Sequence, residues 1–222
     1  MTNQAGPLLS VQGVTVRFGG IVALDGVGFD VARGQVCGLI GPNGAGKTTL
    51  FNCLSRLYNY QSGDVLFNGQ SITRMPTHQI AELGIGRTFQ NLAMFRTLPV
   101  RDNILIGAHS QSSAGFVASA LRLPFVGAEE RRLRARADEI MDYLKLGSVA
   151  DRPVGDLPFG TQKRVELGRA LASEPKLLLL DEPAAGLNHE ELADLGHLIT
   201  DIRDRLKITV LLVEHHMSLV MS

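Results

Sequence analysis

The chain has 222 residues, enough for one large α/β domain with a substantial core, and its 22 Lys and Arg residues balance 22 Asp and Glu residues. This balance excludes a general basic field that would attract nucleic acid or anionic lipid. The start lacks the basic stretch and apolar run of a signal peptide, and no apolar run reaches membrane-spanning length. We therefore expect a soluble, cytosolic chain.

Alternating apolar residues predict two half-buried strands near the N-terminus, over residues 8–18 and 27–31. Further on, Asn68-Gly69 lies between apolar runs and predicts a two-residue hairpin turn. The N-terminal part is therefore expected to carry antiparallel strands.

Between these strands lies a glycine-rich stretch that is preceded by an apolar run, residues 36–40, and followed by an apolar-rich segment, residues 50–57. The stretch is Gly41, Pro42, Asn43, Gly44, Ala45, Gly46, Lys47, Thr48 and Thr49. It fits the pattern G-x-x-x-x-G-K-[ST] of a phosphate-binding loop, in which Lys reaches the β and γ phosphates and the Thr hydroxyl ligates Mg²⁺. A chance match in a surface turn is the alternative, but the strand before and the helix after are the context that phosphate binding at a helix N-terminus requires.

The two cysteines, Cys37 and Cys53, fall in the strand before this loop and in the helix after it. Both have apolar neighbours, which predicts buried, reduced thiols. A metal site would need more ligands at closer spacing.

After the hairpin, Pro76-Thr77 predicts a short helix through Glu82, ended by Gly84, and residues 85–89 predict a strand of the central sheet. From Asn91 the composition changes to a Ser, Gly and Ala-rich stretch and then to a charged helical run. The apolar positions of that run are Leu133, Ala137, Ile140, Met141 and Leu144, with Gly147 expected to close it. We interpret residues 91–160 as an inserted helical lobe.

The C-terminal part alternates helices and buried strands. A helix is predicted over residues 162–172, a buried parallel strand over residues 177–180 and another over residues 208–213. Asn188 and Glu191 form a capping-box pattern for a helix whose apolar face is Leu192, Leu195, Ile199, Ile202 and Leu206.

Two adjacent carboxylates, Asp181 and Glu182, end the strand over residues 177–180. Ligands of parallel α/β sheets bind at the carboxyl ends of strands, so this pair is expected near the phosphate loop. Asp181 is suited to hold Mg²⁺ through water, and Glu182 to orient or deprotonate an attacking water. The alternative is an acidic strand end in solvent.

Taken in order, the phosphate loop, Gln90, the stretch at residues 157–164, Asp181-Glu182-Pro183, residues 185–188 and Glu214-His215 resemble the nucleotide-binding subunit of an ATP-binding cassette (ABC) transporter. The sequence of residues 86–91, 109–136 and 184–188 is most similar to that of the ATP-binding proteins of branched-chain amino acid uptake systems. The resemblance implies a single nucleotide-binding domain over residues 1–222. Its expected α/β fold is a P-loop NTPase (RecA-like) core with an N-terminal antiparallel β subdomain and an inserted α-helical subdomain.

The resemblance also assigns roles. It implies that Phe18 stacks on adenine, that Gln90 senses Mg²⁺ and the γ phosphate, and that His215 contacts the γ phosphate beside the base Glu182. The resemblance also implies a signature segment, which would complete the ATP site of a partner subunit across a head-to-tail dimer. This segment is Leu157, Pro158, Phe159, Gly160 and Thr161.

Four residues depart from the family pattern. Pro158 and Thr161 replace the usual Ser and Gln, Asn188 replaces the usual Asp, and His189 stands where proline is frequent. None of them removes a group that performs the chemistry. The chain stops at Ser222, where a helix from Met217 is expected to begin, so we interpret it as truncated relative to the family.

The prediction that this resemblance implies is an ATP-hydrolysing motor subunit of an importer for branched-chain or related amino acids, using ATP and Mg²⁺ at the cytoplasmic face of the plasma membrane. Its expected partners are membrane permeases, a second nucleotide-binding subunit and an extracytoplasmic solute-binding protein, with no nucleic acid. A soluble ABC ATPase acting on nucleic acid or ribosomes is the alternative, although that class has tandem cassettes or long insertions. A P-loop GTPase or a small-molecule kinase is a third alternative, of which the GTPase is disfavoured because the chain has no Asn-Lys-x-Asp element. The transported solute is not encoded here, since solute contacts lie in other subunits.

Overall fold

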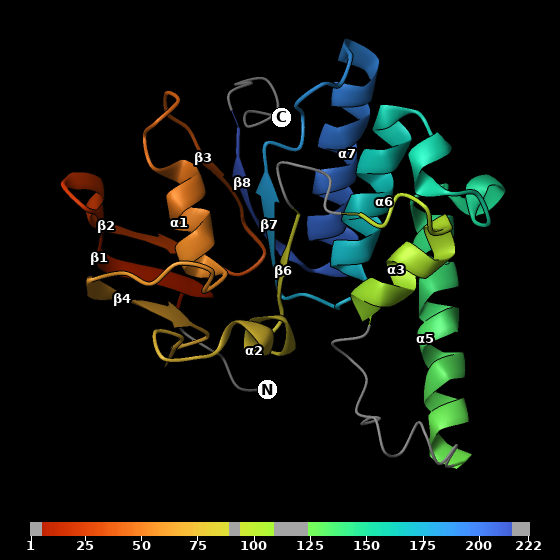
Figure 1. Cartoon of the computed structure of the whole chain (residues 1–222), viewed down its shortest axis with the longest axis horizontal. Coiled ribbons are helices and arrows are strands. Elements are labelled where there is room, and N and C mark those ends of the chain that lie inside the picture. The colour runs from red at the N-terminus through yellow and green to blue at the C-terminus, as the bar shows by residue number, and fades with distance from the viewer. Residues whose placement is uncertain (1–5, 89–93, 109–123, 215–222) are drawn as a thin grey trace. The chain divides into compact units, whose positions relative to one another are not determined.

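The computed structural model describes residues 6–88, 94–108 and 124–214 (Figure 1). Its contacts divide the chain into two compact units, Met1–Arg87 with Lys176–Ser222, and Thr88–Pro175. The second unit is therefore an insertion in the sequence of the first. It includes the helix that follows residue 158, whereas the sequence analysis placed the inserted lobe at residues 91–160.

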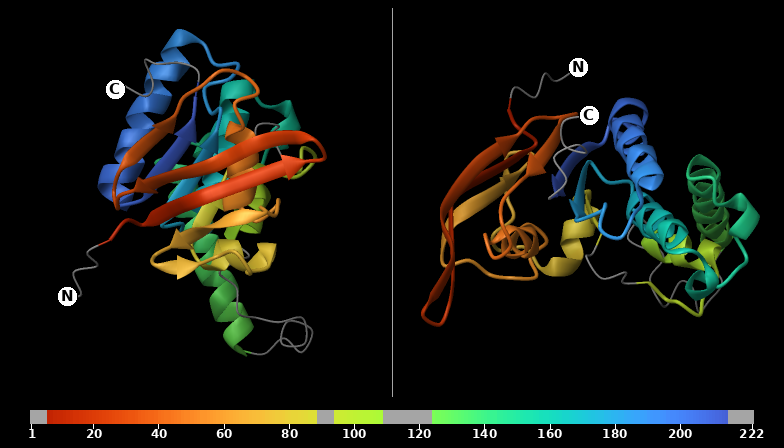
Figure 2. Two further views of the ribbon diagram at one scale, coloured as in Figure 1. Left: turned by 90° about the vertical axis from the view of Figure 1, so that its left-hand side faces the viewer. Right: turned by 90° about the horizontal axis from the view of Figure 1, so that it is seen from above.

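The first unit contains an antiparallel sheet with the strand order β2-β1-β4-β5 (Figure 2). Its strands are β1 (Leu9–Phe18), β2 (Ile21–Val31), β4 (Ser62–Phe67) and β5 (Gln70–Ser71). The predicted hairpin turn is confirmed, because Phe67 pairs with Gln70 across Asn68 and Gly69. Both turn residues have positive φ, 53° and 79°, as the tight two-residue turn requires.

The same unit contains a parallel sheet with the order β3-β8-β7-β6. Its strands are β3 (Val36–Leu39), β6 (Ile85–Arg87), β7 (Leu177–Asp181) and β8 (Thr209–Val213). Every residue of β7 and β8 is buried, which confirms the predicted apolar central strands.

Both faces of the parallel sheet are covered. On one face α1 (Lys47–Leu54) lies between this sheet and the antiparallel sheet, and on the other lies α7 (His189–Leu206) (Figures 1 and 2). Phe51 and Leu54 of α1 share one core with residues from both sheets, among them Val14 of β1 and Leu179 of β7. This packing fixes the start of α1 relative to the ends of the parallel strands.

The helix ends of this unit follow their sequence signals. At α7, the Asn188 side chain accepts from the Glu191 N–H at 2.9 Å and the Glu191 carboxylate accepts from the Asn188 N–H at 2.9 Å, so the predicted capping box is confirmed. The helix α2 (Thr77–Glu82) begins after Pro76, and Gly84 after it has φ 97°. Of the predicted apolar face of α7, Ile199 and Ile202 are buried, but Leu206 is exposed.

Within the described ranges, the second unit contains α3 (Val100–Ala108), α5 (Pro124–Tyr143), the 3-10 turns η2 (Gly147–Val149) and η3 (Val154–Asp156), and α6 (Phe159–Leu171). α3 and α6 approach at backbone distance, since a Cβ on Gly107 would lie 2.0 Å from the Arg169 carbonyl oxygen. Two predicted boundaries were wrong. The chain leaves α5 through Lys145, which has φ 57°, so Gly147 instead begins η2, and α6 begins at Phe159 rather than at residue 162.

Some predictions concern residues outside the described ranges. Gln90, His215 and the helix expected from Met217 are among them. Cys53 is buried as predicted, whereas Cys37 is half-buried. Among the helices of the described ranges, none has the length and apolar character needed to cross a bilayer.

Candidate nucleotide-binding site

The register of the parallel sheet brings the predicted phosphate loop and the two carboxylates to one edge. Val213 of β8 pairs with Leu39 of β3 on one side and with Asp181 of β7 on the other. The ends of the three strands are therefore level, and Asp181 stands two strand spacings, roughly 10 Å, from the strand that feeds the loop. This proximity was expected from the sequence.

The phosphate loop joins β3 to α1 through glycines in left-handed conformations. Gly44 has φ 82°, and Gly46, the N-cap of α1, has φ 87°. A Cβ on Gly46 would also lie 2.7 Å from Leu24 Cδ2, because β2 passes directly beside the helix start. The loop therefore needs glycine at Gly46 for both its backbone angle and its packing. The first backbone N–H groups of α1 follow directly after the loop and lack intrahelical acceptors, so the N-terminus of α1 is a positive, anion-binding helix end.

Lys47 is held inside the loop by two carbonyl groups. Its Nζ donates to the Gly41 oxygen at 2.6 Å and to the Pro42 oxygen at 2.9 Å. Thr48, at the next position, is exposed at the start of α1. A cation and a hydroxyl thus lie together at a helix N-terminus, the arrangement that binds phosphate and Mg²⁺ in a loop of this kind.

Asp181 is a buried carboxylate whose side chain is only 1% exposed and pairs with Arg87 at 3.0 Å. Burial lowers the pKa of the Arg87 guanidinium, while the hydrogen bond and the charge of Asp181 oppose that change. No role was predicted for Arg87 from the sequence. The available signal was a lone arginine at the end of a strand that enters a buried sheet, where a charge needs a partner.

Glu182 follows Asp181 in a strained conformation that sets its direction. Its φ is 50°, and its N–H donates to the Val213 oxygen at 3.0 Å. The next turn is fastened by Glu214, a buried residue whose carboxylate accepts from the Ala184 N–H at 2.8 Å. Glu214 was quoted in the sequence analysis without a role of its own. It attaches the turn after Glu182 to the end of β8, the strand that leads to His215.

Phe18 lies exposed at the tip of the β1–β2 hairpin and contacts a second aromatic ring. Its ring centroid is 5.4 Å from that of Tyr58 in an edge-to-face arrangement. The Gln61 side chain fastens the two segments, accepting from the Arg17 N–H at 2.9 Å and donating to the Arg17 oxygen at 3.2 Å. The partner strand of this hairpin, β2, also passes beside Gly46 at Ala23 and Leu24.

The signature segment lies in the second unit at the start of α6. Pro158 is the N-cap, and the first hydrogen bond of the helix runs from the Gln162 N–H to the Pro158 oxygen at 3.0 Å. The buried Gln162 amide also donates to the Leu157 oxygen at 2.8 Å and so fixes the chain before the helix. Pro158 and Phe159 are exposed, and the Lys163 ammonium lies 5.7 Å from the centre of the Phe159 ring. The N–H groups of this first turn lack intrahelical acceptors and form an anion-binding helix end.

Two predicted site residues, Gln90 and His215, lie outside the described ranges. Their neighbours in sequence are placed: Arg87 ends β6, and Glu214 follows β8. Both of these strands belong to the parallel sheet whose edge carries the phosphate loop and Asp181.

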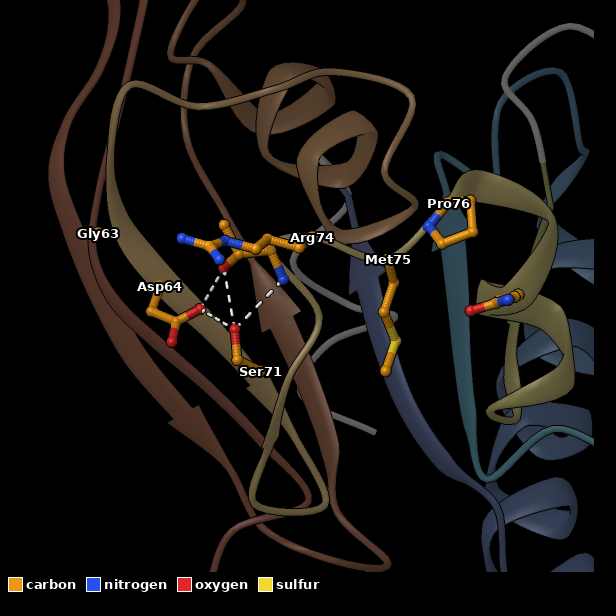
Figure 3. A pocket seen from close by; sticks show the side chains of 8 residues that line it. Gly63, Asp64, Ser71, Arg74, Met75 and Pro76 are labelled. Atoms are coloured by element: carbon orange, nitrogen blue, oxygen red, sulfur yellow. Dashed lines mark hydrogen bonds between the residues drawn. The ribbon is translucent and has the colours of Figure 1, made fainter.

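A separate pocket of about 580 Å³ lies between the β4–β5 hairpin and α2 (Figure 3). Its lining residues are Gly63, Asp64, Ser71, Thr73, Arg74, Met75, Pro76 and Gln79. Burial works against ionisation of Asp64, but hydrogen bonds from Ser71, Thr73 and the Val65 N–H keep its pKa below the usual value. The pocket contains none of the predicted site residues.

Comparisons with known proteins agree with this geometry. The profile of the family described as ABC transporter matches residues 24–185. The chain is 42% identical to the high-affinity branched-chain amino acid transport ATP-binding protein BraF of Pseudomonas aeruginosa, covering 97% of this chain and 85% of the relative. It is 40% identical to LivG of Escherichia coli, which has the same description and the same coverage. A crystal structure of the ADP conformation of an ABC transporter cassette superposes with a TM-score of 0.83 at 33% identity, covering 96% of this chain and 83% of that one.

Proposed function

This chain belongs to the ABC transporter family, and from that premise we propose that it is the ATP-hydrolysing subunit of an importer for branched-chain amino acids. The observation that carries the proposal is the level alignment of the phosphate loop with Asp181 and Glu182 at one edge of the parallel sheet. The substrate class is supported by the descriptions of BraF and LivG, which match the chain over nearly its whole length.

The chemistry of the site follows from these positions. Lys47 and the N–H groups of the loop bind the β and γ phosphates, and Glu182 orients the attacking water and accepts its proton. Thr48 and Asp181 fit Mg²⁺, which takes few protein oxygens and completes its shell with phosphates and water. Mg²⁺, when bound, neutralises the phosphate charge that grows during transfer.

Three further residues complete this site. Phe18, supported at its ring by Tyr58, stacks on adenine. Gln90 contacts Mg²⁺ and the γ phosphate, and His215 contacts the γ phosphate. The place of His215 directly after Glu214 supports its role, since β8 ends between the phosphate loop and Asp181.

The signature segment serves a second copy of the site in a head-to-tail dimer. Pro158 and Phe159 are exposed, and the α6 start offers N–H groups and a positive helix end to the γ phosphate of the partner's ATP. We expect one chain alone to hydrolyse ATP poorly. The further partners are membrane permease subunits and an extracytoplasmic solute-binding protein, with the chain at the cytoplasmic face of the membrane.

The test is Glu182→Gln in the assembled transporter, with Glu190→Gln, an exposed carboxylate at the start of α7, as the matched control. The amide still hydrogen-bonds but accepts no proton, so phosphate release should fall about 10²- to 10⁴-fold while ATP binding persists. Leucine uptake into reconstituted vesicles should fall with it.

Full phosphate release by the Glu182→Gln variant would exclude Glu182 as the base. ATP hydrolysis without uptake of any branched-chain amino acid by the unmodified transporter would contradict the substrate class and leave the ATPase assignment intact.

A further inference from the structure

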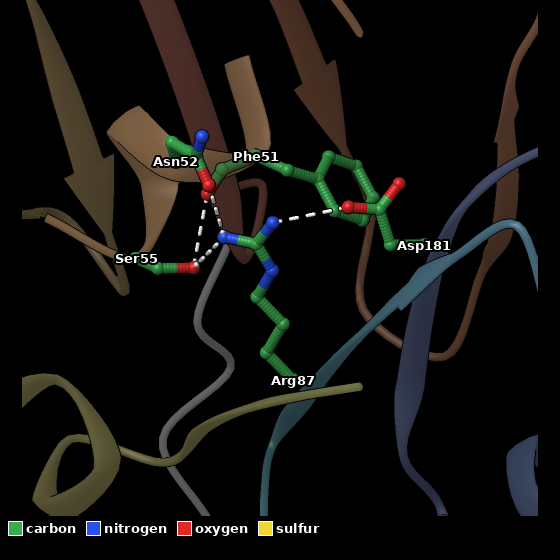
Figure 4. A network of polar contacts seen from close by, with 5 residues as sticks. All are labelled: Phe51, Asn52, Ser55, Arg87 and Asp181. Carbon is green, nitrogen blue, oxygen red and sulfur yellow. Dashed lines mark hydrogen bonds and ion pairs between the residues drawn. The ribbon is translucent and has the colours of Figure 1, made fainter. Parts of the chain in front are cut away.

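The Arg87 side chain joins three elements of the first unit (Figure 4). From the end of β6, its Nη2 donates to Asp181 Oδ2 on β7 at 3.0 Å. Its Nη1 donates to Asn52 Oδ1 at 2.9 Å and to Ser55 Oγ at 3.1 Å, both at α1. The guanidinium carbon lies 5.6 Å from the centre of the Phe51 ring. One planar group therefore binds the carboxylate strand and the phosphate-loop helix together.

This contact is buried, with 7% of the Arg87 side chain and 1% of the Asp181 side chain exposed. Separating the two charges would leave each in a poorly solvating interior, so the pair keeps its geometry. Arginine suits this place because its rigid fork serves two partners from two nitrogens, whereas the lysine ammonium is a point charge.

The contact reaches α1 on the face that carries Thr48. Asn52 is four residues after Thr48 and Ser55 is seven after it, so all three lie on one side of the helix. Arg87 thus contacts α1 on the face that carries Thr48, and it contacts the carboxylate of Asp181 on β7. These are the two elements that bear the proposed Mg²⁺ residues. It also ends the strand that leads to Gln90.

We propose that Arg87 is a positioning residue for the Mg²⁺ site. By holding Asp181 and the Thr48 face of α1 at a fixed separation, Arg87 sets the affinity of the site for the Mg²⁺–nucleotide complex. The inference rests on the proposed function, specifically on the role of Asp181 and Thr48 at Mg²⁺. Nucleotide alone binds through Lys47 and the loop N–H groups, whereas the contacts of Arg87 described above are with Asp181, Asn52 and Ser55.

The experiment measures binding of a fluorescent ATP analogue to the full chain, first in EDTA and then across a Mg²⁺ titration. Arg87→Met, of similar length and without charge, should change affinity in EDTA less than twofold and raise the Mg²⁺ midpoint at least tenfold. Arg87→Lys keeps a charge beside Asp181, but its single ammonium cannot also donate to Asn52 and Ser55 of α1. It should therefore raise the Mg²⁺ midpoint at least threefold. Arg205→Met, at an exposed arginine of α7, is the matched control and should leave both values unchanged.

Asn52→Leu provides an independent variant if Arg87→Met folds poorly. It removes a partner on α1 and keeps the ion pair with Asp181, and we expect at least a threefold higher midpoint. A midpoint that stays unchanged in Arg87→Lys and Asn52→Leu would overturn the inference and leave Arg87 a structural ion pair. A lower midpoint would also overturn it, because Arg87 would then compete with Mg²⁺ for Asp181.

Asp181→Asn distinguishes a failure of the proposed Mg²⁺ role of Asp181 from a failure of the inference on Arg87. If it leaves the Mg²⁺ midpoint unchanged, the proposed Mg²⁺ role of Asp181 fails, and the inference on Arg87 fails with it. If it raises the midpoint while the Arg87 and Asn52 variants do not, only the inference on Arg87 is wrong.

Discussion

The carbonyl oxygen of Ala23 occupies space beside Gly46, where an added Cβ atom would lie only 2.5 Å away. The contact joins β2 to the first turn of α1, so the antiparallel sheet supports the phosphate loop directly. The neighbour is backbone, which cannot rotate away as a side chain would. A side chain at this position would therefore have to displace either the strand or the loop.

Gly46→Ala should accordingly destabilise the chain and weaken nucleotide binding. The left-handed φ of 87° alone costs a residue with a Cβ about 1–2 kcal/mol, and the contact with Ala23 adds to it. Thermal unfolding followed by circular dichroism measures the loss. Gly147→Ala is the control, since its added Cβ would meet only Asp142 Oδ1 at 3.6 Å. Equal midpoints for the two variants would contradict this account of the loop.

Lys47→Ala should remove productive nucleotide binding. Charge-assisted contacts to a phosphate contribute about 1.5–3 kcal/mol, or roughly ten- to more than a hundredfold in affinity. Titration with a fluorescent ATP analogue measures the change, and unfolding without nucleotide checks that the fold survives the loss of the Gly41 and Pro42 hydrogen bonds. A folded variant with unchanged affinity would rule out the phosphate-loop assignment.

Pro158→Ser should change the ATPase rate of the assembled transporter less than about tenfold, which corresponds to 1.4 kcal/mol. Pro158 is the N-cap of α6, and serine is a preferred N-cap that contributes about 1 kcal/mol. Loss of the fixed proline φ offsets this by about 0.4–1 kcal/mol through the entropy of the unfolded chain. Steady-state phosphate release measures the change in rate. A loss of activity would mean that the proline itself is required.

Gly160→Asp, two residues further on, should abolish that activity, because it places a carboxylate against the partner's phosphate. An acidic residue in the first turn of a helix is favourable to the helix itself. The melting temperature should therefore hold while the rate is lost. An active Gly160→Asp variant would show that the signature segment does not face ATP.

Cys53 should make the chain less stable in alkali. Desolvation by burial raises the pKa of this thiol, and the nearby Arg56 charge lowers it by less, so that the pKa is about 11. In the unfolded chain the thiol ionises near pH 9, so the unfolded state binds fewer protons between pH 9 and 11 and the free energy of unfolding falls as pH rises. The slope approaches roughly 1.4 kcal/mol per pH unit for one proton. Urea unfolding at pH 8, 9 and 10 should give a shallower fall for Cys53→Ala, and identical slopes would contradict the shifted pKa.

Local patterns in the sequence were sufficient to predict several parts of this protein. The phosphate loop, the Asn68-Gly69 turn and the capping box at Asn188 each depend on hydrogen bonds and backbone angles within a few residues. The apolar run before Asp181 predicted a buried strand because the strands of parallel sheets are covered on both faces. The expected position of Asp181 and Glu182 near the phosphate loop then followed from a general rule, that ligands bind at the carboxyl ends of parallel strands.

Only the tertiary structure decided which distant residues support these motifs. Arg87 and Asp181 are 94 residues apart in sequence, and Ala184 and Glu214 are 30 apart. No local pattern encodes such pairs, because they depend on strand order, on register and on how closely the elements pack. The start of α6 at Phe159 was missed for a related reason, since the exposed Pro158 and Phe159 carry no apolar periodicity. Sequence thus specified the groups that we propose to act on the nucleotide, while packing between distant segments determined the residues that hold those groups in place.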